Sequence, residues 1–231
     1  MLRVGLTGGL GSGKSTAGAY LRELGAEVIE ADEMGRALME PGHAVFDEIV
    51  RTFGSEVVGS DGRLSRAKLA DLAFRGGRLQ ELNAIVHPAV IEQQRQWMNG
   101  VFARNPAAVA VVVTALIFEV ERDARARGES ESVLSDWRRR IDRVVVVTAP
   151  DDVKIARYVA RLGMDNVNRA AAEIDARSRL AHQIPDALKA ARADYVLDNQ
   201  GDKPLLRVEV EALWRRLSAE SNNRSQHGFL E

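Results

Sequence analysis

The chain has 231 residues, and its 32 Lys and Arg nearly balance its 33 Asp and Glu, for a formal net charge of -1. This length predicts one large domain, or a core with an insertion, that buries a substantial apolar core. The balanced charge gives no overall basic field, so we predict no nucleic-acid partner. The sequence contains no cysteine, which excludes disulfides, thiol catalysis and cysteine-based metal sites.

Membrane insertion is not expected from the hydropathy pattern. The longest apolar run, residues 107–118, is shorter than a membrane-spanning helix requires. A first strand is expected almost at the N-terminus, which leaves no room for a signal peptide. We therefore expect a cytoplasmic protein without a membrane partner, as a monomer or small homo-oligomer.

A glycine-rich loop, Gly8–Thr16, follows the first apolar run, Leu2–Leu6, and precedes a helix-like segment. Its sequence GGLGSGKST satisfies the pattern G-x-x-x-x-G-K-[S/T] in full. Such a loop cradles phosphate with backbone N–H groups and a helix N-terminus, whereas the alternative is an ordinary glycine-rich turn. We expect Lys14 to reach the β- and γ-phosphates and the Ser15 hydroxyl to ligate Mg²⁺. The residues expected to bind ATP here are Gly9, Gly11, Ser12, Gly13, Lys14, Ser15 and Thr16.

The second predicted strand, 27–31, leads to Glu30-Ala31-Asp32. Ligands of open parallel sheets bind at the carboxyl ends of the strands, where the glycine loop also begins. Asp32 is therefore expected near the γ-phosphate, while an N-cap role for a helix starting at Glu33 is equally compatible with its position. Arg36 follows four residues later on the same helix face, where it either contacts a substrate phosphate or is solvated.

Residues 33–105 show no strand pattern and are longer than a crossover requires. Short helices are predicted at 66–74 and 88–102, and we interpret the stretch as a helical substrate-binding insertion. His87-Pro88 is expected to begin a helix, since proline is favoured in a first turn.

Three further strands are predicted at 109–118, 144–148 and 195–197. Within the first two, residues 109–113 and 144–147 are continuously apolar, as expected when helices cover both faces of a parallel sheet. The alternation of strands and helices predicts a three-layer α/β/α fold with a five-stranded parallel sheet. Segment 151–182 is expected to be helical and arginine-rich. The charged segment 121–140 includes the cluster Arg138-Arg139-Arg140, which we interpret as a solvated helix face rather than a nucleic-acid patch.

Several segments, in the same order along the chain, resemble the dephospho-coenzyme A kinase family. The resemblance rests on the glycine loop with 28–32, then 40–42, 61–66, Ile85-Val86-His87-Pro88, 116–119, 142–147 and 193–199. It extends from about residue 1 to 217. It implies a P-loop kinase core made of residues 1–32, 106–150 and 193–217, a helical coenzyme A domain at 33–105 and a lid at 151–192. The remaining residues, 218–231, are expected to form a loose polar tail.

The resemblance also implies a reaction, transfer of the ATP γ-phosphoryl group to the ribose 3′-hydroxyl of dephospho-coenzyme A with Mg²⁺. Asp32 would accept the hydroxyl proton, and Glu30 would assist with the metal or its water shell. His87 and Pro88 would shape the acceptor pocket with Arg36. Arginines of the lid would clamp phosphate oxygens, with Arg157 as a catalytic residue and Arg179 as an ATP ligand.

The sequence departs from this family's pattern at several positions. Val113 stands where an acid is usual, Ala115 where proline is frequent, Ile91 where arginine is frequent and Lys154 where glutamine is usual. Two alternatives therefore stay open: another P-loop nucleoside or nucleotide kinase, and a catalytically weakened ATP-binding homologue. A GTP-dependent switch is disfavoured, since the chain has Asp198-Asn199-Gln200-Gly201 rather than Asn-Lys-x-Asp.

Overall fold

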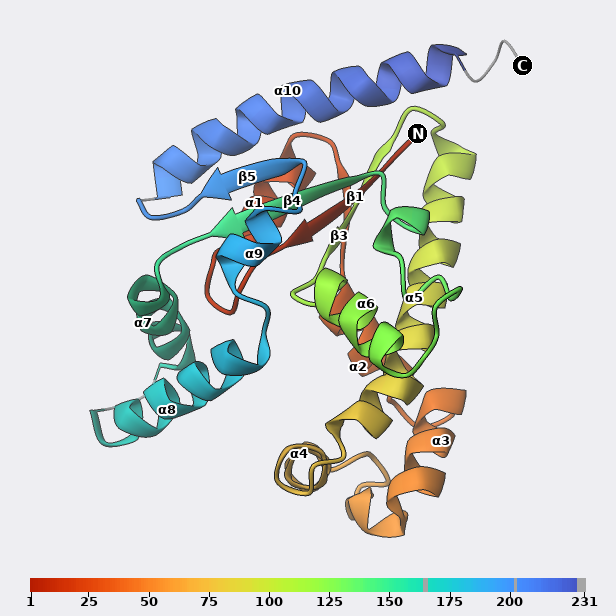
Figure 1. Ribbon diagram of the computed structural model, residues 1–231, viewed down its shortest axis with the longest axis vertical. Coiled ribbons are helices and arrows are strands. Elements are labelled where there is room, and N and C mark those ends of the chain that lie inside the picture. Colours follow the sequence, from red (N-terminus) through yellow and green to blue (C-terminus); the bar gives the residue numbers. More distant parts are fainter. Residues whose placement is uncertain (164–165, 202, 228–231) are drawn as a thin grey trace. The chain divides into compact units, whose positions relative to one another are not determined.

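The computed structural model describes residues 1–163, 166–201 and 203–227. Its central element is a sheet of five parallel strands in the order β2-β3-β1-β4-β5 (Figure 1). The strands are β1 (Leu2–Thr7), β2 (Glu27–Glu30), β3 (Val109–Val113), β4 (Arg143–Thr148) and β5 (Tyr195–Asp198). The five-stranded parallel sheet predicted from the sequence is thereby confirmed.

Helices connect these strands. They are α1 (Lys14–Glu23), α2 (Ala31–Leu38), α3 (Ala44–Phe53), α4 (Arg66–Ala70), α5 (Leu79–Arg104), α6 (Ile117–Ala126), α7 (Asp151–Leu162), α8 (Asn166–His182), α9 (Asp186–Ala190) and α10 (Lys203–His227). Shorter turns of helix are η1 (Ser55–Val57), η2 (Asp71–Arg75, of the π type) and η3 (Trp137–Arg139). In the described part of the chain, no helix combines the length and the apolar character that crossing a membrane requires.

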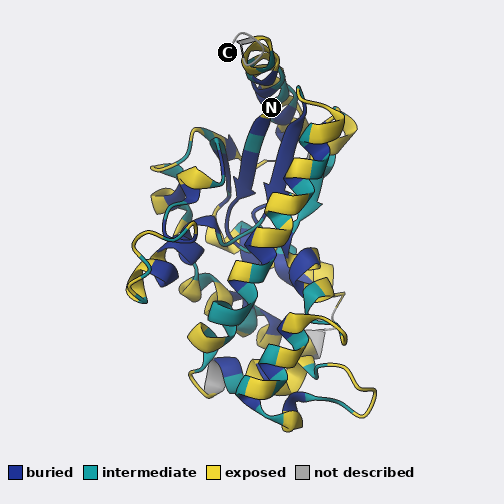
Figure 2. Ribbon diagram, turned by 90° about the vertical axis from the view of Figure 1, so that its right-hand side faces the viewer, coloured by how far each residue is buried: buried dark blue, intermediate teal, exposed yellow. Residues whose placement is uncertain are grey.

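The sheet is covered on both faces, which explains its continuously apolar strands. Alternate residues of β4 show the division: Val145 and Val147 pack with α1 and α10, whereas Val144 and Val146 pack with α6 and η3. All four side chains are fully buried, and the strands stand out as buried between more exposed helices (Figure 2). The three-layer arrangement follows directly from this two-sided burial.

The apolar run 109–118 proves to be two elements rather than one strand. β3 ends at Val113, and α6 begins at Ile117 after a turn in which the Leu116 N–H donates to the Thr114 hydroxyl oxygen over 3.1 Å. Ile117 and Phe118 are buried as part of the helix. A buried strand and a buried helix start look alike in apolar content, so the run alone did not separate them.

The expectation that Pro88 begins a helix is wrong, because Pro88 lies well inside α5. An interior proline removes one backbone donor and costs about 3 kcal/mol. Apolar contacts on both sides of it offset this cost. Ile85 and Val86 pack on a core cluster that includes Ile49, and Ile91 is buried.

The chain divides into two compact units, which we describe separately. One comprises Met1–Glu30 with Met98–Glu231 and contains the sheet; the other is Ala31–Trp97. The helical unit has its own apolar core, formed by Val45, Ile49, Phe53, Val57 and Leu69. It starts two residues before the expected insertion 33–105 and ends at Trp97. Because it starts at Ala31, it includes Asp32.

The expectation of a loose tail does not hold for residues 218–227, which continue α10. The Ser221 hydroxyl is buried and lies 2.9 Å from the Ala107 carbonyl oxygen and 3.0 Å from that of Ala108. Leu217 is also fully buried, in the core cluster of the sheet. These contacts hold the helix end in place, and residues 228–231 lie outside the described part.

A buried ion pair connects α6 to α9. The Lys189 ammonium, fully inaccessible to solvent, lies 2.7 Å from Glu119 Oε1 and donates to the Ala115 carbonyl oxygen over 2.7 Å. Glu119 Oε1 also accepts from the Ile184 N–H over 2.9 Å. We expect Lys189→Met to lower the free energy of unfolding by about 3 kcal/mol, since it leaves a buried carboxylate unpaired. Urea denaturation measures this loss.

The double variant Lys189→Met/Glu119→Gln should recover most of the lost stability, because it removes the stranded charge and keeps an acceptor for Ile184. An exposed pair on α8, Arg169 with Glu173, provides the control. Its removal should change stability by about 0.5 kcal/mol at most. An equal effect at both pairs would contradict this account of the buried one.

Candidate nucleotide-binding site

The loop between β1 and α1 passes so close to its neighbours that glycine is required. Gly11 has φ 73°, and a Cβ there would lie 2.3 Å from the Lys154 carbonyl oxygen. Gly13 has φ 101°, and its Cβ would lie 2.1 Å from Asn199 Nδ2. Other residues rarely adopt such φ values. Glycine at these two positions therefore lets the loop fold closely against the Lys154 backbone and the Asn199 side chain.

Lys14 is the first residue of α1 and reaches back over the loop. Its Nζ donates to the Gly9 carbonyl oxygen over 3.0 Å, and the Ser12 N–H donates to the same oxygen over 3.2 Å. Ser15 is exposed in the same first turn, and Gly13 provides no side-chain cap. The uncapped N–H groups and the positive helix end therefore form a site for an anion.

Two hydroxyls near this loop are buried without a hydrogen-bond partner among the described residues. They belong to Ser12 and to Thr7, the last residue of β1, and both residues are fully buried. Buried polar atoms are normally paired. Their isolation marks the loop as a place where a polar ligand or water completes the structure.

The segment after β5 supports the loop from one side. Asn199 Nδ2 donates to the Ser12 carbonyl oxygen over 2.7 Å, and the Asn199 N–H donates to the Thr148 carbonyl oxygen. Arg157, on α7, donates in turn to the carbonyl oxygens of Asn199 and Gly201 over 3.0 and 3.2 Å. The structure thus gives Arg157 a supporting contact, and its catalytic role stays a prediction.

Arg179 lies on α8 beside Tyr158 of α7. Its Nε donates to Asp175 Oδ2 over 2.9 Å, its guanidinium carbon is 5.8 Å from the Tyr158 ring centre, and the side chain is 58% exposed. The Tyr158 hydroxyl donates to the same Asp175 oxygen. Burial and this hydrogen bond raise the pKa of Tyr158. Arg179 is held yet accessible, as its predicted contact with ATP requires.

The segment joining α8 to α9 contacts the loop in a way the sequence analysis missed. The Gly9 N–H donates to Asp186 Oδ1 over 2.9 Å, and the Leu10 N–H donates to Gln183 Oε1 over 3.0 Å. No sequence motif marks Asp186. Its ion-pair partner, Lys154, does stand out in the sequence, because the family usually has glutamine at that position. The Gly9 amide is thus occupied by protein, as is the Ser12 amide, which donates to the Gly9 carbonyl oxygen.

The remaining predicted site residues lie in the helical unit. α2 begins at Ala31, so Asp32 is inside its first turn rather than at an N-cap. Asp32 and Arg36 are both exposed on α2, while His87 is buried within α5. A negative charge in the first turn of a helix interacts favourably with the helix dipole.

A magnesium ion would fit this site as a nucleotide-borne ion. Within the described residues, no group of three His, Cys, Asp or Glu could hold a metal ion. Mg²⁺ commonly uses one or two protein oxygens and takes the rest from phosphates and water. The exposed Ser15 hydroxyl in the first turn of α1 suits that arrangement.

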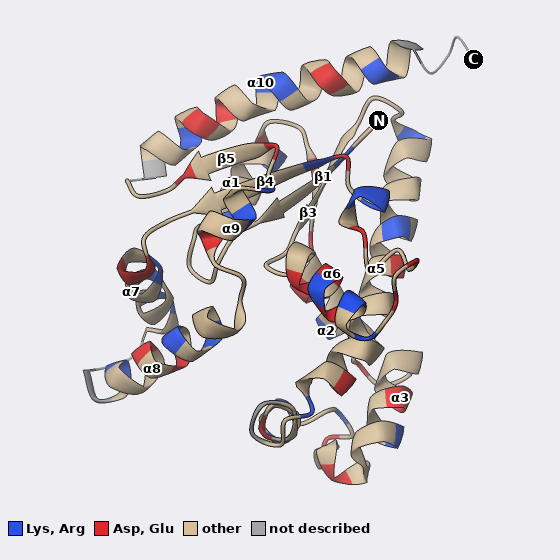
Figure 3. Cartoon of the chain, in the orientation of Figure 1, with Lys and Arg blue, Asp and Glu red and all other residues tan. Residues whose placement is uncertain are grey.

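The expected solvated face at Arg138-Arg139-Arg140 holds for the first two residues only. Arg138 and Arg139 are exposed in η3, but Arg140 is partly buried, and burial lowers the pKa of its guanidinium to about 10. The reason is that a 3₁₀ turn, not an amphipathic α-helix, places these three residues. Acidic and basic residues are interspersed along the neighbouring α6 (Figure 3).

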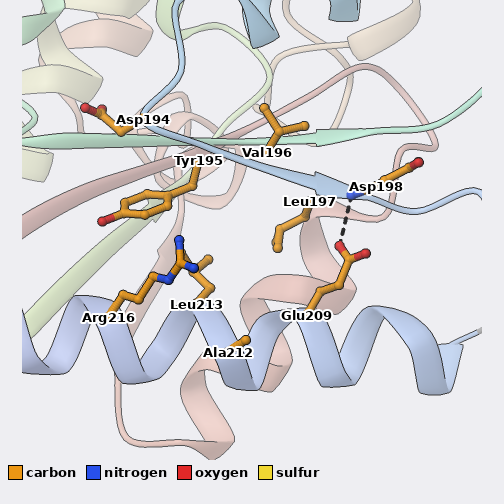
Figure 4. A pocket seen from close by; sticks show the side chains of 9 residues that line it. All are labelled: Asp194, Tyr195, Val196, Leu197, Asp198, Glu209, Ala212, Leu213 and Arg216. Carbon is orange, nitrogen blue, oxygen red and sulfur yellow. Dashed lines mark hydrogen bonds between the residues drawn. The ribbon is translucent and has the colours of Figure 1, made fainter.

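A separate cavity of about 380 Å³ lies between β5 and α10. Asp194, Tyr195 and Arg216 are among the residues that line it, and Glu209 closes one end by accepting from the Asp198 N–H (Figure 4). None of the predicted site residues lines this cavity. The candidate site is therefore the glycine loop and its surroundings.

A parallel five-stranded sheet with a complete phosphate-binding loop between β1 and α1 defines a P-loop kinase. The sequence pattern of the dephospho-CoA kinase family matches residues 2–204. The chain belongs to this family, and it is a phosphotransferase. A similar protein is the dephospho-CoA kinase of Corynebacterium diphtheriae, which is 37% identical; the match covers 94% of this chain and 98% of the relative. Another is the dephospho-CoA kinase of Anaeromyxobacter dehalogenans, which is 40% identical; that match covers 91% of this chain and 89% of the relative.

Solved structures agree on the fold. TT1252 from Thermus thermophilus superimposes with a TM-score of 0.68 at 30% identity, covering 93% of this chain and 96% of its own. Dephospho-CoA kinase from Campylobacter jejuni superimposes with a TM-score of 0.56 at 18% identity, covering 94% and 97%. The second likeness concerns the fold alone.

Proposed function

We propose that this chain catalyses the last step of coenzyme A synthesis, phosphorylation of dephospho-coenzyme A by ATP. The observation that carries the proposal is the intact loop, with Lys14 at the start of α1, in a member of the dephospho-CoA kinase family. The reaction breaks the bond between the γ-phosphorus and the β,γ-bridging oxygen. It forms a bond from that phosphorus to the ribose 3′-oxygen, and the hydroxyl proton leaves to a base.

On the donor side, the chain neutralises and aligns the phosphates. The loop N–H groups of Gly11, Ser12, Gly13 and Thr16 and the positive end of α1 would face the phosphate oxygens. Lys14 would exchange its contact with the Gly9 carbonyl for the β- and γ-phosphates. Mg²⁺, held through Ser15, would supply charge neutralisation between these phosphates when bound.

On the acceptor side, Asp32 would orient the 3′-hydroxyl and accept its proton late in the transfer. Asp32 follows β2 by two residues and lies in the first turn of α2. Arg36, His87 and Pro88 are proposed to shape the acceptor pocket. Arg157 and Arg179 belong to α7 and α8, proposed as a lid that excludes water over bound ATP. A cytoplasmic location accords with this activity and stays a prediction.

The departure at Val113 keeps a weakened homologue as the second candidate. Val113 is buried, and a Cβ on Gly18 of α1 would lie 3.0 Å from its side chain, so it faces the α1 side of the sheet. Glu30 is paired with Val113 in the adjacent strand, and paired residues of neighbouring strands point to the same face. We propose that Glu30 supplies the carboxylate that Val113 lacks.

The test is ADP release by the purified chain with Mg²⁺ and ATP, with and without dephospho-coenzyme A, and detection of coenzyme A by mass. Acceptor-dependent ADP with matching coenzyme A is expected. The same assay with nucleosides and nucleoside monophosphates as acceptors tests the alternative that the chain is a nucleoside or nucleotide kinase. ATP binding without coenzyme A formation would favour the weakened homologue.

A further inference from the structure

Two successive N–H groups of the loop are held by side chains from the turn after α8 and from the first residue of α9. Asp186 accepts from Gly9 N and Gln183 accepts from Leu10 N. Asp186 thereby holds the Gly8–Gly9 peptide, and Gln183 holds the next one, Gly9–Leu10, whose carbonyl accepts from Lys14 Nζ and Ser12 N. This peptide is therefore fixed from both sides, and its orientation decides where the Lys14 ammonium rests.

The Asp186 carboxylate is itself held in place by a buried lysine. Lys154 Nζ lies 2.8 Å from Asp186 Oδ2 and 2.7 Å from Asp151 Oδ1. The Lys154 side chain is 4% exposed and that of Asp186 11%, whereas that of Asp151 is 74% exposed. Burial alone lowers the pKa of Lys154, but its hydrogen bonds to the two carboxylates outweigh burial and raise the pKa above its ordinary value. The lysine therefore stays charged.

Charge explains why a lysine is needed at this position. An isolated carboxylate beside a phosphate-binding loop would repel the nucleotide. The Lys154 ammonium cancels the Asp186 charge at the distance of an ion pair, and the Lys154 backbone also contacts the loop, as its carbonyl oxygen faces Gly11. The pair supplies a strong acceptor for the Gly9 N–H, and the second carboxylate on this ammonium, Asp151, is exposed, so that solvent screens its charge.

We propose that Asp186, neutralised by Lys154, is a positioning residue for ATP that acts through the Gly9 backbone on Lys14. This inference rests on the proposed use of the loop for ATP. According to this inference, Lys154, Gln183 and Asp186 attach the segment α7–α9 to the loop at a fixed point. If the segment closes over the nucleotide, the parts that move are then the C-terminal part of α7 and the N-terminal part of α8.

Three variants separate the acceptor from the charge, with binding of a fluorescent ATP analogue and KM for ATP as readouts. Asp186→Ala removes the acceptor and should weaken ATP binding about tenfold. Asp186→Asn keeps an acceptor and should restore most of this loss. Lys154→Gln leaves the carboxylate uncompensated and should weaken binding about tenfold at low salt, with a smaller effect at high salt. All three should change KM for ATP more than kcat.

Asp151→Asn is the matched control, because Asp151 also pairs with Lys154 but is exposed, and within the described residues the side chains that hold the Gly9 and Leu10 N–H groups are those of Asp186 and Gln183. It should bind ATP like the unaltered chain, and thermal unfolding should show that every variant folds. Equal loss in Asp186→Ala and Asp186→Asn, or a salt-independent loss in Lys154→Gln, overturns the positioning role. If ATP binding is unchanged in all variants, the positioning role of Asp186 is overturned and the proposed function is not. If the unaltered chain does not bind ATP, the proposed function is overturned as well.

Discussion

Asp32→Asn is expected to lower kcat by about a thousandfold while leaving ATP affinity unchanged. A carboxylate that accepts a proton during the transfer contributes a factor of about 10² to 10⁴, and an amide cannot replace it. ATP affinity should persist because its proposed ligands come from the glycine loop and α1, not from α2. Steady-state kinetics at saturating ATP and dephospho-coenzyme A, together with an ATP titration, measure both quantities.

Glu33→Gln is the control for this experiment. Glu33 is also acidic, exposed and in the first turn of α2, so the variant loses the same charge and the same dipole interaction. It should keep full turnover. Near-normal turnover in Asp32→Asn would reduce Asp32 to a stabiliser of the α2 terminus.

Lys14→Ala should impair both ATP affinity and rate, with a loss of roughly a thousandfold in kcat/KM. The ammonium neutralises charge on the β- and γ-phosphates in the bound nucleotide and again as charge develops during transfer. Removal of one such preorganised donor typically costs about 10² to 10³ in rate, and weaker binding adds to that. Nucleotide titration and initial-rate kinetics separate the two contributions.

Arg22→Ala removes an equal charge from the last turn of the same helix, where Arg22 donates to the Val28 carbonyl oxygen. It should leave both parameters nearly unchanged. Unchanged kinetics in Lys14→Ala would contradict the assignment of the glycine loop as the nucleotide site.

The sequence predicted the sheet and the phosphate loop well because both depend on local patterns. Continuous apolar runs located the buried parallel strands, and the spacing of Gly8, Gly13 and Lys14 located the loop. Prediction was weaker where an element is decided by packing. The run 109–118 is apolar in both β3 and α6, and Pro88 is tolerated in α5 only because apolar neighbours on both sides offset its cost.

The site was predicted in part for the same reason. Lys14 and Ser15 belong to a loop pattern with fixed spacing, and the role of Asp32 stays a prediction, whereas Asp186 reaches Gly9 across 177 positions of sequence. No local signal reports such a contact. The unusual Lys154 was visible, but only the fold shows that its charge neutralises Asp186.

The position of β1 has a consequence for synthesis of the chain. β1 is the first strand to be made, yet it lies between β3 and β4, so one of its edges stays unpaired until residue 113 has been translated and the other until residue 148. The loop after β1 becomes complete later still, because the hydrogen bond from Asn199 to the Ser12 carbonyl oxygen spans 187 positions of sequence. A nascent chain that stops short of β5 thus carries the nucleotide motif in full, but lacks the contact that holds it in shape.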